Sequence, residues 1–261
     1  MITAIGLDHQ DFLGDDREAI GREKAGIMRG GMPVVCGDAD PPHSVLLAAT
    51  GLGAPLERIG EDFRVRNLAD RLEIRLAEGP VRLPNPALPG VHQATNLATA
   101  VAALNRVFPD LARNEASLAK GVSGTRLRGR LERHAADSRI LLDVGHNPQA
   151  AGVVAKYLSE SRRGRCICVL AMLADKQAEA VADRLAGVVD TWICAGLQGP
   201  RGQTGKSLAE RIAGGAGPGR AWVERDVSGA LDRARGIAEK KDTILVFGSF
   251  ETVAAALRHL E

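Results

Sequence analysis

Short apolar segments alternate with helix-like segments from about residue 130 to the end of the chain. Each apolar run has the length of a strand, and each intervening segment is long enough for a helix. Strands separated by helices require a mostly parallel sheet with right-handed crossovers. The pattern predicts strands at residues 131–134, 140–144, 166–171, 191–195, 220–223 and 243–247, and helices at 149–160, 177–187, 207–213, 228–239 and 251–259.

The most informative stretch within this region is residues 140–151, which read ILLDVGHNPQAA. Three apolar residues run into Asp143, and Pro148 suits the first turn of a helix that Asn147 caps. The turn therefore follows the carboxyl end of a strand, where open α/β sheets bind their ligands. Asp143 and His146 then form a candidate site, although the same residues also suit a simple strand end with an Asx turn.

The first half of the chain has a different organisation. We expect a buried strand at 2–7, a helix at 17–28, a strand at 32–37 and a helix at 43–50, and then a β-meander at about 56–84, where apolar and polar residues alternate. An Ala-rich helix at 92–106 and a shorter helix at 114–121 follow. Residues 123–130 combine glycine, small polar residues and arginines, so we place the domain boundary there, giving domains 1–124 and 125–261.

Composition excludes several classes of protein. The net charge of +2 argues against a nucleic-acid partner, and no apolar run reaches the length of a membrane span. The first residues lack the basic segment and cleavage site of a signal peptide. The cysteines form no CxxC pair and lie mostly in strand-like runs, which favours reduced, buried thiols in a cytoplasmic protein.

Residues 199–207, GPRGQTGKS, superficially match a phosphate-binding P-loop. A Walker A motif needs glycine, four residues and then Gly-Lys-Ser/Thr, but Pro200 stands at the first glycine position. Since proline has no N–H to offer a phosphate, we interpret this segment as an ordinary loop between a strand and a helix.

Several motifs occur together in one order along the chain: LDH at 7–9, FLG at 12–14, REAIGREKAGI at 17–27, NLATA at 96–100, RLRGR at 126–130, DVGHNP at 143–148, MLADK at 172–176, GPRG at 199–202 and VFGSF at 246–250. Each motif is weak alone, but the ordered set resembles the folylpolyglutamate synthase/dihydrofolate synthase family, the folate branch of the Mur ligases. The resemblance implies the C-terminal portion of a central ATPase domain, followed by a Rossmann-like, mostly parallel α/β C-terminal domain.

The resemblance also implies a chemistry that uses ATP and Mg²⁺. Enzymes of this family join L-glutamate to dihydropteroate or folate through an acyl phosphate, and we expect a monomer that binds only small molecules. His9 resembles the family's metal ligand, and Lys24 resembles its carbamylated lysine, which would take part in catalysis. Without the resemblance, a lone histidine is more often structural, and Lys24 would be a solvated helix residue.

Further site residues follow from the same resemblance. Asn96, Arg130 and Asp143 match positions that contact ATP. The resemblance implies that His146 lies near the adenine or touches glutamate as a catalytic group, and that Ser249 contacts the substrate. The active site would lie between domains and would need domain closure.

The chain also departs from the family pattern. The glycine-rich phosphate loop and a metal-binding glutamate precede the Asp-His strand in the family, and neither occurs before Asp8 here. We therefore expect the chain alone to be inactive as a ligase. The alternatives are a Mur-type ligase for another acid acceptor and a non-catalytic remnant that binds nucleotide.

Overall fold

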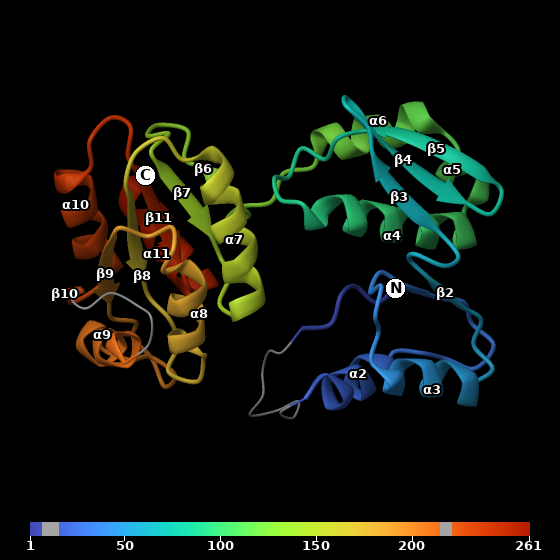
Figure 1. Ribbon diagram of the computed structural model, residues 1–261, viewed down its shortest axis with the longest axis horizontal. Helices are drawn as coiled ribbons and strands as arrows, with labels where there is room; N and C mark the ends of the chain where they lie inside the picture. The colour runs from blue at the N-terminus through green and yellow to red at the C-terminus, as the bar shows by residue number, and fades with distance from the viewer. Residues whose placement is uncertain (7–15, 215–220) are drawn as a thin grey trace. The chain divides into compact units, whose positions relative to one another are not determined.

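The computed structural model describes residues 1–6, 16–214 and 221–261. It contains two compact units, Met1–Arg126 and Leu127–Glu261, which we call the front unit and the rear unit (Figure 1). The assignment of residues 1–124 to a partial ATPase domain and of 125–261 to a C-terminal domain stays a prediction.

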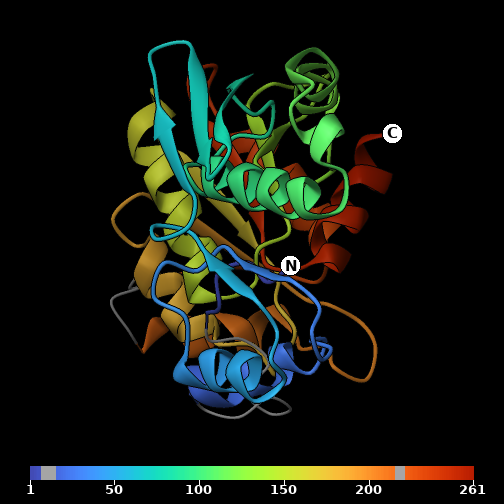
Figure 2. The ribbon, with the colours of Figure 1, turned by 90° about the vertical axis from the view of Figure 1, so that its right-hand side faces the viewer.

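The front unit contains two small sheets and the helices that cover them. Its elements are α2 (Arg17–Ala25), β1 (Val34–Cys36), α3 (His43–Gly51), β2 (Leu56–Arg58), β3 (Arg64–Asn67), β4 (Arg71–Leu76), β5 (Gly79–Pro84), α4 (His92–Val107), α5 (Pro109–Ala112) and α6 (Glu115–Gly124). Strands β1 and β2 pair in parallel, whereas β3, β4 and β5 form the antiparallel sheet drawn in cyan in Figure 2.

Strand β1 connects the two apolar clusters of the front unit. Val34 and Cys36 pack with residues of α2 and α3, while Val35 between them packs with residues of α4 and the antiparallel sheet. This alternation is what a strand buried on both faces produces. The two segments that pair with β1, at Ile2 and at residues 56–58, both differ from the expected elements.

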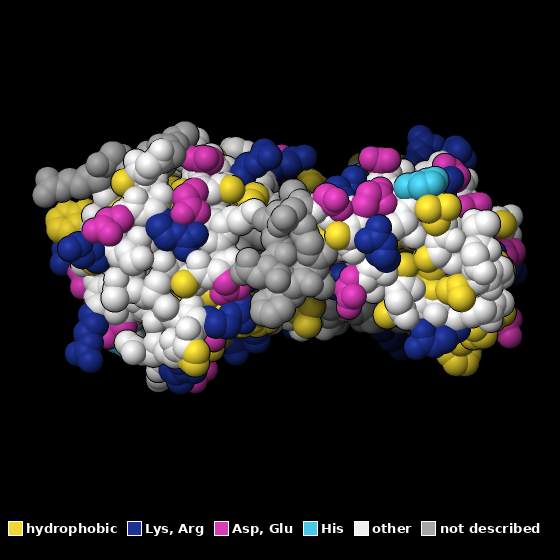
Figure 3. Space-filling view, turned by 90° about the horizontal axis from the view of Figure 1, so that it is seen from below, with side chains coloured by type: hydrophobic (Ala, Val, Ile, Leu, Met, Phe, Trp, Pro, Cys, Tyr) yellow, Lys and Arg dark blue, Asp and Glu magenta, His cyan; other side chains and the backbone are white. Residues whose placement is uncertain are grey.

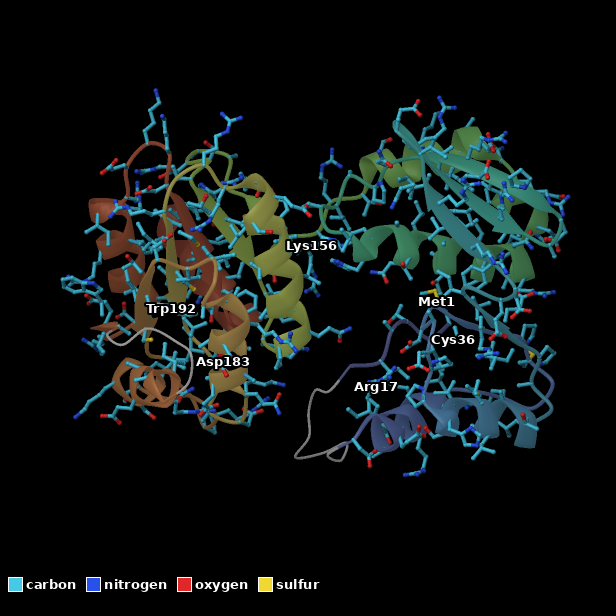
Figure 4. All side chains as sticks on the ribbon, in the orientation of Figure 1. Met1, Arg17, Cys36, Lys156, Asp183 and Trp192 are labelled. Carbon is cyan, nitrogen blue, oxygen red and sulfur yellow. The ribbon has the colours of Figure 1, made fainter. Side chains whose placement is uncertain are left out.

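The expected strand at residues 2–7 is wrong. Among residues 2–6, which the structure describes, only Ile2 pairs as a strand residue, through a single bridge with Cys36. The Ile5 N–H donates to Asp38 Oδ2 at 2.8 Å, and the Ile5 carbonyl accepts from Arg17 Nε at 3.0 Å. The Asp38 and Arg17 side chains therefore occupy the N–H and the carbonyl of Ile5 that strand pairing would have used (Arg17 is labelled in Figure 4).

The expected meander at 56–84 is shorter than predicted, because β2 leaves it and pairs with β1 instead. The helix expected at 17–28 ends at Ala25, where the Gly26 N–H turns back to the Glu23 carbonyl at 3.0 Å.

The rear unit confirms the predicted α/β architecture. Its elements are β6 (Glu132–Arg133), β7 (Ile140–Asp143), α7 (Pro148–Ser161), β8 (Cys166–Leu170), α8 (Ala178–Leu185), β9 (Thr191–Ala195), α9 (Gly205–Ala213), β10 (Trp222–Glu224), α10 (Val227–Ile237), β11 (Thr243–Phe247) and α11 (Phe250–Leu260). The sheet order is β10-β9-β8-β11-β7-β6, and every neighbouring pair is parallel except β6 with β7.

Helices cover both faces of this sheet. Helices α7, α8 and α9 pack on one face, against residues such as Leu141, Cys168 and the buried Trp192 (labelled in Figure 4). Helices α10 and α11 pack on the other face, against residues such as Ile167 and Val246. The sheet is therefore doubly wound, and its central strands are buried on both sides.

Candidate functional site

The order in which the chain adds strands to the rear sheet reverses at β11. The chain moves outward from β7 through β8, β9 and β10, and then returns to insert β11 between β8 and β7. As a result, α7 leaves the end of β7 toward one face, while α11 leaves the end of the adjacent β11 toward the other. Open α/β sheets bind ligands at such a switch point, outside the carboxyl ends of the strands.

Asp143 ends β7 and pairs in register with Phe247, the last residue of β11. Its carboxylate is buried, and it accepts the Gly145 N–H on Oδ1 at 2.8 Å and the Leu131 N–H on Oδ2 at 3.0 Å. Both bonds cross short loops at the carboxyl edge of the sheet. Asp143 therefore ties the chain before β6 to the end of β7, and we call this pair of hydrogen bonds the Asp143 latch.

The latch holds a turn in an unusual backbone conformation. Leu131 is the one non-glycine residue with a positive φ among the described residues, at 47°. Such a conformation costs about 1–2 kcal/mol for an L-residue, so it persists only where surrounding bonds enforce it. Gly129 has a φ of 66°, and its carbonyl accepts the Val144 N–H at 2.9 Å. A Cβ at Gly129 would approach Val144 Cγ1 to 2.6 Å, so the turn and the strand end need glycine there.

Arg130 lies at the exposed tip of this turn. Its guanidinium carbon lies 5.6 Å from the ring centroid of Phe250, which is 62% exposed at the start of α11. Of the nearby arginines, Arg128 Nε lies 2.9 Å from Glu132, whereas Arg126 and Arg133 donate to backbone carbonyls. In the part of the chain that the structure describes, Arg130 has no carboxylate partner and no such carbonyl bond.

Ser249 is the cap of α11, and it is buried. Its Oγ accepts the Thr252 N–H at 3.0 Å and lies 2.7 Å from Thr252 Oγ1, which donates to the Ala171 carbonyl at 2.6 Å. These bonds join α11 to the end of β8. The predicted substrate contact at Ser249 stays a prediction, while the hydrogen bonds assign this hydroxyl a capping role.

His146 lies in the loop between β7 and α7. Its Nδ1 lies 3.1 Å from the Val144 carbonyl, which can only accept, so Nδ1 carries the proton. Asn147 caps α7 as expected, since its side chain accepts the Ala150 N–H at 2.8 Å. The structure thus brings Arg130, Asp143, His146 and Ser249 to one edge of the rear sheet.

The remaining predicted residues belong to the front unit. Asn96 lies in the second turn of α4 and lines an apolar cavity of about 480 Å³, together with Gln93 and Leu97. Lys24 is exposed in the last turn of α2. His9 lies outside the described residues. Within residues 1–6, 16–214 and 221–261, no group of three or more His, Cys, Asp or Glu side chains could hold a metal ion.

The P-loop-like segment connects β9 with α9, as expected of an ordinary loop. Its backbone bonds internally, with the Gly202 N–H donating to Gly199 at 3.0 Å and the Leu197 N–H donating to Gln203 at 3.0 Å. Thr204 caps α9, and the Lys206 side chain is 79% exposed. Two N–H groups of the loop are thus occupied internally, and the segment lines a hollow of about 430 Å³ together with Val223 and Arg225.

Sequence reasoning missed two contacts at the carboxyl edge. Nothing local pairs Arg130 with Phe250, because the two residues are far apart in the chain and meet only when β11 inserts beside β7. Likewise Arg201 donates from Nε to Asp175 at 3.1 Å, joining the loops after β8 and β9, and this hydrogen bond holds the pKa of Asp175 below its ordinary value. The MLADK and GPRG motifs were the available signals for this second contact.

Charge and hydropathy add little further constraint. On the face shown in Figure 3, basic and acidic side chains are interspersed, as a net charge of +2 implies. None of the described helices combines the length and the apolar character needed to cross a bilayer.

Comparison with known proteins shows what the chain resembles. Residues 129–250 match the Mur ligase family, in its glutamate ligase domain. The dihydrofolate synthase/folylpolyglutamate synthase of Escherichia coli is 36% identical over all of this chain and 60% of its own length. The enzyme of the same name from Haemophilus influenzae is also 36% identical, over 97% of this chain and 61% of its own length.

Solved structures agree with these sequence matches. The structure described as E. coli FolC in complex with DHPP and ADP has a TM-score of 0.87 and 35% identity, covering 98% of this chain and 60% of that one. The Yersinia pestis bifunctional folylpolyglutamate synthase/dihydrofolate synthase complexed with AMPPNP and Mn ion has a TM-score of 0.83 and 34% identity, covering 98% of this chain and 60% of that one. The chain thus spans about 60% of the length of the curated relatives described above. Residues 129–250 are therefore similar to the glutamate ligase domain of the Mur ligases.

Proposed function

We propose that this chain provides the nucleotide-holding half of an ATP-dependent ligase that joins L-glutamate to dihydropteroate or a folate. The observation that carries the proposal is Arg130, a cation without a carboxylate partner in the described chain, mounted at the switch point of the rear sheet. The similar structure of E. coli FolC is a complex with DHPP and ADP, which supports a nucleotide as the ligand of this chain.

The electrostatics of the switch point favour an anion. Helices α7 and α11 both begin there, capped by Asn147 and Ser249. The N-terminus of a helix carries a partial positive charge, and its outward N–H groups bind anions. Arg130 adds a permanent charge with a fork of donors that suits phosphate. These three features converge on the carboxyl ends of β7 and β11.

The reaction needs such a site because hydroxide is a poor leaving group. The acceptor carboxylate is first phosphorylated, and the amine of glutamate then displaces phosphate to form the amide. Phosphoryl transfer depends mainly on positioning and on neutralising charge. In this chain Arg130 would neutralise phosphate charge, Asp143 would hold the turn that presents Arg130, and His146 would lie at the same edge of the sheet.

Mg²⁺, when bound, would supply further neutralisation of the phosphate charge. The resemblance assigns the ion to His9 and to a carbamylated Lys24, but His9 lies outside the described residues and Lys24 is exposed in α2. No step is therefore assigned to these two residues. Asn96 would contact the nucleobase of ATP. This residue lines a cavity with apolar walls and a few polar groups, which is the usual composition of a small-molecule site.

Calorimetric titration of the full chain with ADP tests the proposal. We expect binding that Arg130→Ala weakens about tenfold or more, since hydrogen bonds to charged groups are worth about 1.5–3 kcal/mol. Lys206→Ala is the matched control, because it removes an exposed cation from the P-loop-like segment, and its affinity should equal that of the wild type. Loss of binding in Lys206→Ala but not in Arg130→Ala would refute the proposed site.

A ligation assay tests the activity of the chain by itself. Because Pro200 stands where a Walker A motif needs its first glycine, we expect no ATP-dependent incorporation of labelled glutamate into dihydropteroate by the purified chain. Measurable incorporation would refute that expectation. Nucleotide binding without ligation of any acceptor would favour the non-catalytic alternative, and ligation of another acid would favour a Mur-type ligase of different specificity. We also expect a monomer in sedimentation velocity.

A further inference from the structure

Phe250 is one of three strongly exposed aromatic side chains among the described residues, with Phe108 and Trp222. It is the first residue of α11 and is 62% exposed, although large aromatic side chains are normally buried. Its neighbours Phe247 and Ser249 are both buried. The exposed ring therefore contributes little to the core of the rear unit, and its main recorded partner is the guanidinium of Arg130, at 5.6 Å from the ring centroid.

We propose that Phe250 is a positioning residue for Arg130, whose guanidinium its ring face holds at the switch point, ready for the phosphate groups of a nucleotide. This inference rests on the proposed function and deepens it. An arginine side chain has many rotamers, and an exposed arginine on a tight turn would sample most of them. A cation over the face of an aromatic ring within about 6 Å is attracted by the ring quadrupole.

The position of this pair argues for an anionic ligand. The N-terminus of α11 carries a partial positive charge, which Glu251 in its first turn offsets in part. The Phe250 ring attracts the Arg130 guanidinium without neutralising its charge, whereas a carboxylate in direct contact would neutralise it. Arg130 therefore keeps its full charge for a ligand, in contrast to Arg128, which pairs with Glu132.

The backbone fixes the other end of the same side chain. The Asp143 latch holds Leu131 directly after Arg130, and the Gly129 carbonyl directly before it accepts the Val144 N–H. The Cα of Arg130 is thus held between two bonded residues, and the ring holds its guanidinium. Together the two attachments restrict the side chain at both ends, which lowers the entropy cost of ordering it when a ligand binds.

The first test needs no nucleotide. In a ¹⁵N- and ¹³C-labelled full chain, the side-chain proton resonances of Arg130, assigned by their loss in Arg130→Lys, should show an upfield ring-current shift. Phe250→Leu should abolish that shift, and Phe250→Tyr should keep it. Trp222→Leu is the matched control, because it removes the other cation–aromatic pair of the rear unit, where Arg233 lies 4.5 Å from the Trp222 ring. An Arg130 shift that is unchanged in Phe250→Leu would overturn the proposal.

The second test measures the consequence for ADP binding. We expect Phe250→Leu to weaken affinity about two- to fivefold, with Phe250→Tyr close to wild type and Trp222→Leu unchanged. In an Arg130→Ala background, Phe250→Leu should have no further effect, because a positioning residue acts only through the residue that it positions. An equal loss in both backgrounds would mean that Phe250 contacts the nucleotide itself, and would overturn the positioning role. If no variant binds ADP, the proposed function fails, while the ring-current measurement still decides the pairing.

Discussion

Asp143→Asn should destabilise the rear unit by about 2–3 kcal/mol. The buried carboxylate accepts two backbone N–H bonds, from Leu131 and Gly145, and an asparagine can present only one oxygen to them. One bond of about 1.5–3 kcal/mol to a charged group is lost, and the asparagine amide then faces an N–H donor. For a unit of this size, each kcal/mol corresponds to about 3–4 °C, so the melting temperature should fall by about 7–10 °C.

Urea unfolding followed by tryptophan fluorescence measures this loss selectively. The chain has two tryptophans, Trp192 and Trp222, and both belong to the rear unit. The fluorescence transition therefore reports the rear unit and not the front unit. A loss below about 0.5 kcal/mol, the range of ordinary surface substitutions, would show that the latch does not hold the turn as described.

Asp242→Asn is the matched control for this experiment. Asp242 is also buried, and it accepts the Arg165 N–H at 2.8 Å and the Glu239 N–H at 3.0 Å. It precedes β11 and so lies at the opposite edge of the sheet from Asp143. Both variants should lose stability, but only Asp143→Asn should weaken ADP binding, and that effect should disappear in an Arg130→Ala background. Equal weakening by both variants would refute the assigned site.

Three further outcomes follow from the same structure. Gly129→Ala should lose at least about 1 kcal/mol of stability, because Gly129 has a positive φ and a Cβ there would contact Val144. Gly152→Ala in α7 should instead gain about 0.5–1 kcal/mol, because a Cβ there meets nothing within 4 Å. The midpoints of urea unfolding measure both changes in the free energy of unfolding. Burial opposes ionisation of Asp242, but the Glu239 and Arg165 N–H groups and the Arg165 guanidinium outweigh it and lower its pKa. This carboxylate therefore stabilises the fold above its unfolded pKa of about 4 and loses that contribution as pH falls through the folded value. Acid titration of the wild type should show a loss of stability that is smaller in Asp242→Asn. Burial raises the pKa of Cys166 to about 12, so this thiol should resist a disulfide reagent at pH 8 until urea unfolds the rear unit, and reaction of the native chain at that site would contradict its burial.

The rear unit was predictable because its signals are local and repeated. Each strand is a short apolar run that ends at a turn, and β9 occupies the residues expected for it, 191–195. Strand order was not predictable in the same way, because the insertion of β11 between β7 and β8 depends on crossovers rather than on any local pattern.

The front unit shows where local patterns fail. Residues 2–6 are apolar enough for a strand, but the Asp38 and Arg17 side chains bind the backbone of Ile5 from distant positions. Similarly, residues 56–58 alternate like the meander that follows, yet they pair with β1, a strand that only the tertiary structure brings beside them. Side-chain competition and long-range pairing therefore explain both errors.

The location of Asp143 and His146 at a strand end was predictable, but their roles were not. The DVGHNP motif located Asp143 and His146, and the carboxyl end of a strand gave a physical reason for a ligand there. The direct ATP contact predicted for Asp143 stays a prediction, whereas the structure assigns its carboxylate a latch for the Arg130 turn. A positive φ at Leu131 and an aromatic partner at Phe250 have no signature in the sequence, since both depend on how loops meet at the sheet edge.

A titration of the ¹⁵N-labelled full chain with ADP, followed by amide and arginine side-chain shifts, tests the central claim most directly. The account predicts that the largest changes occur at Arg130, Gly145 and His146 and at the start of α11, with small changes at Lys206. Changes concentrated in residues 196–206, or confined to the front unit, would contradict it.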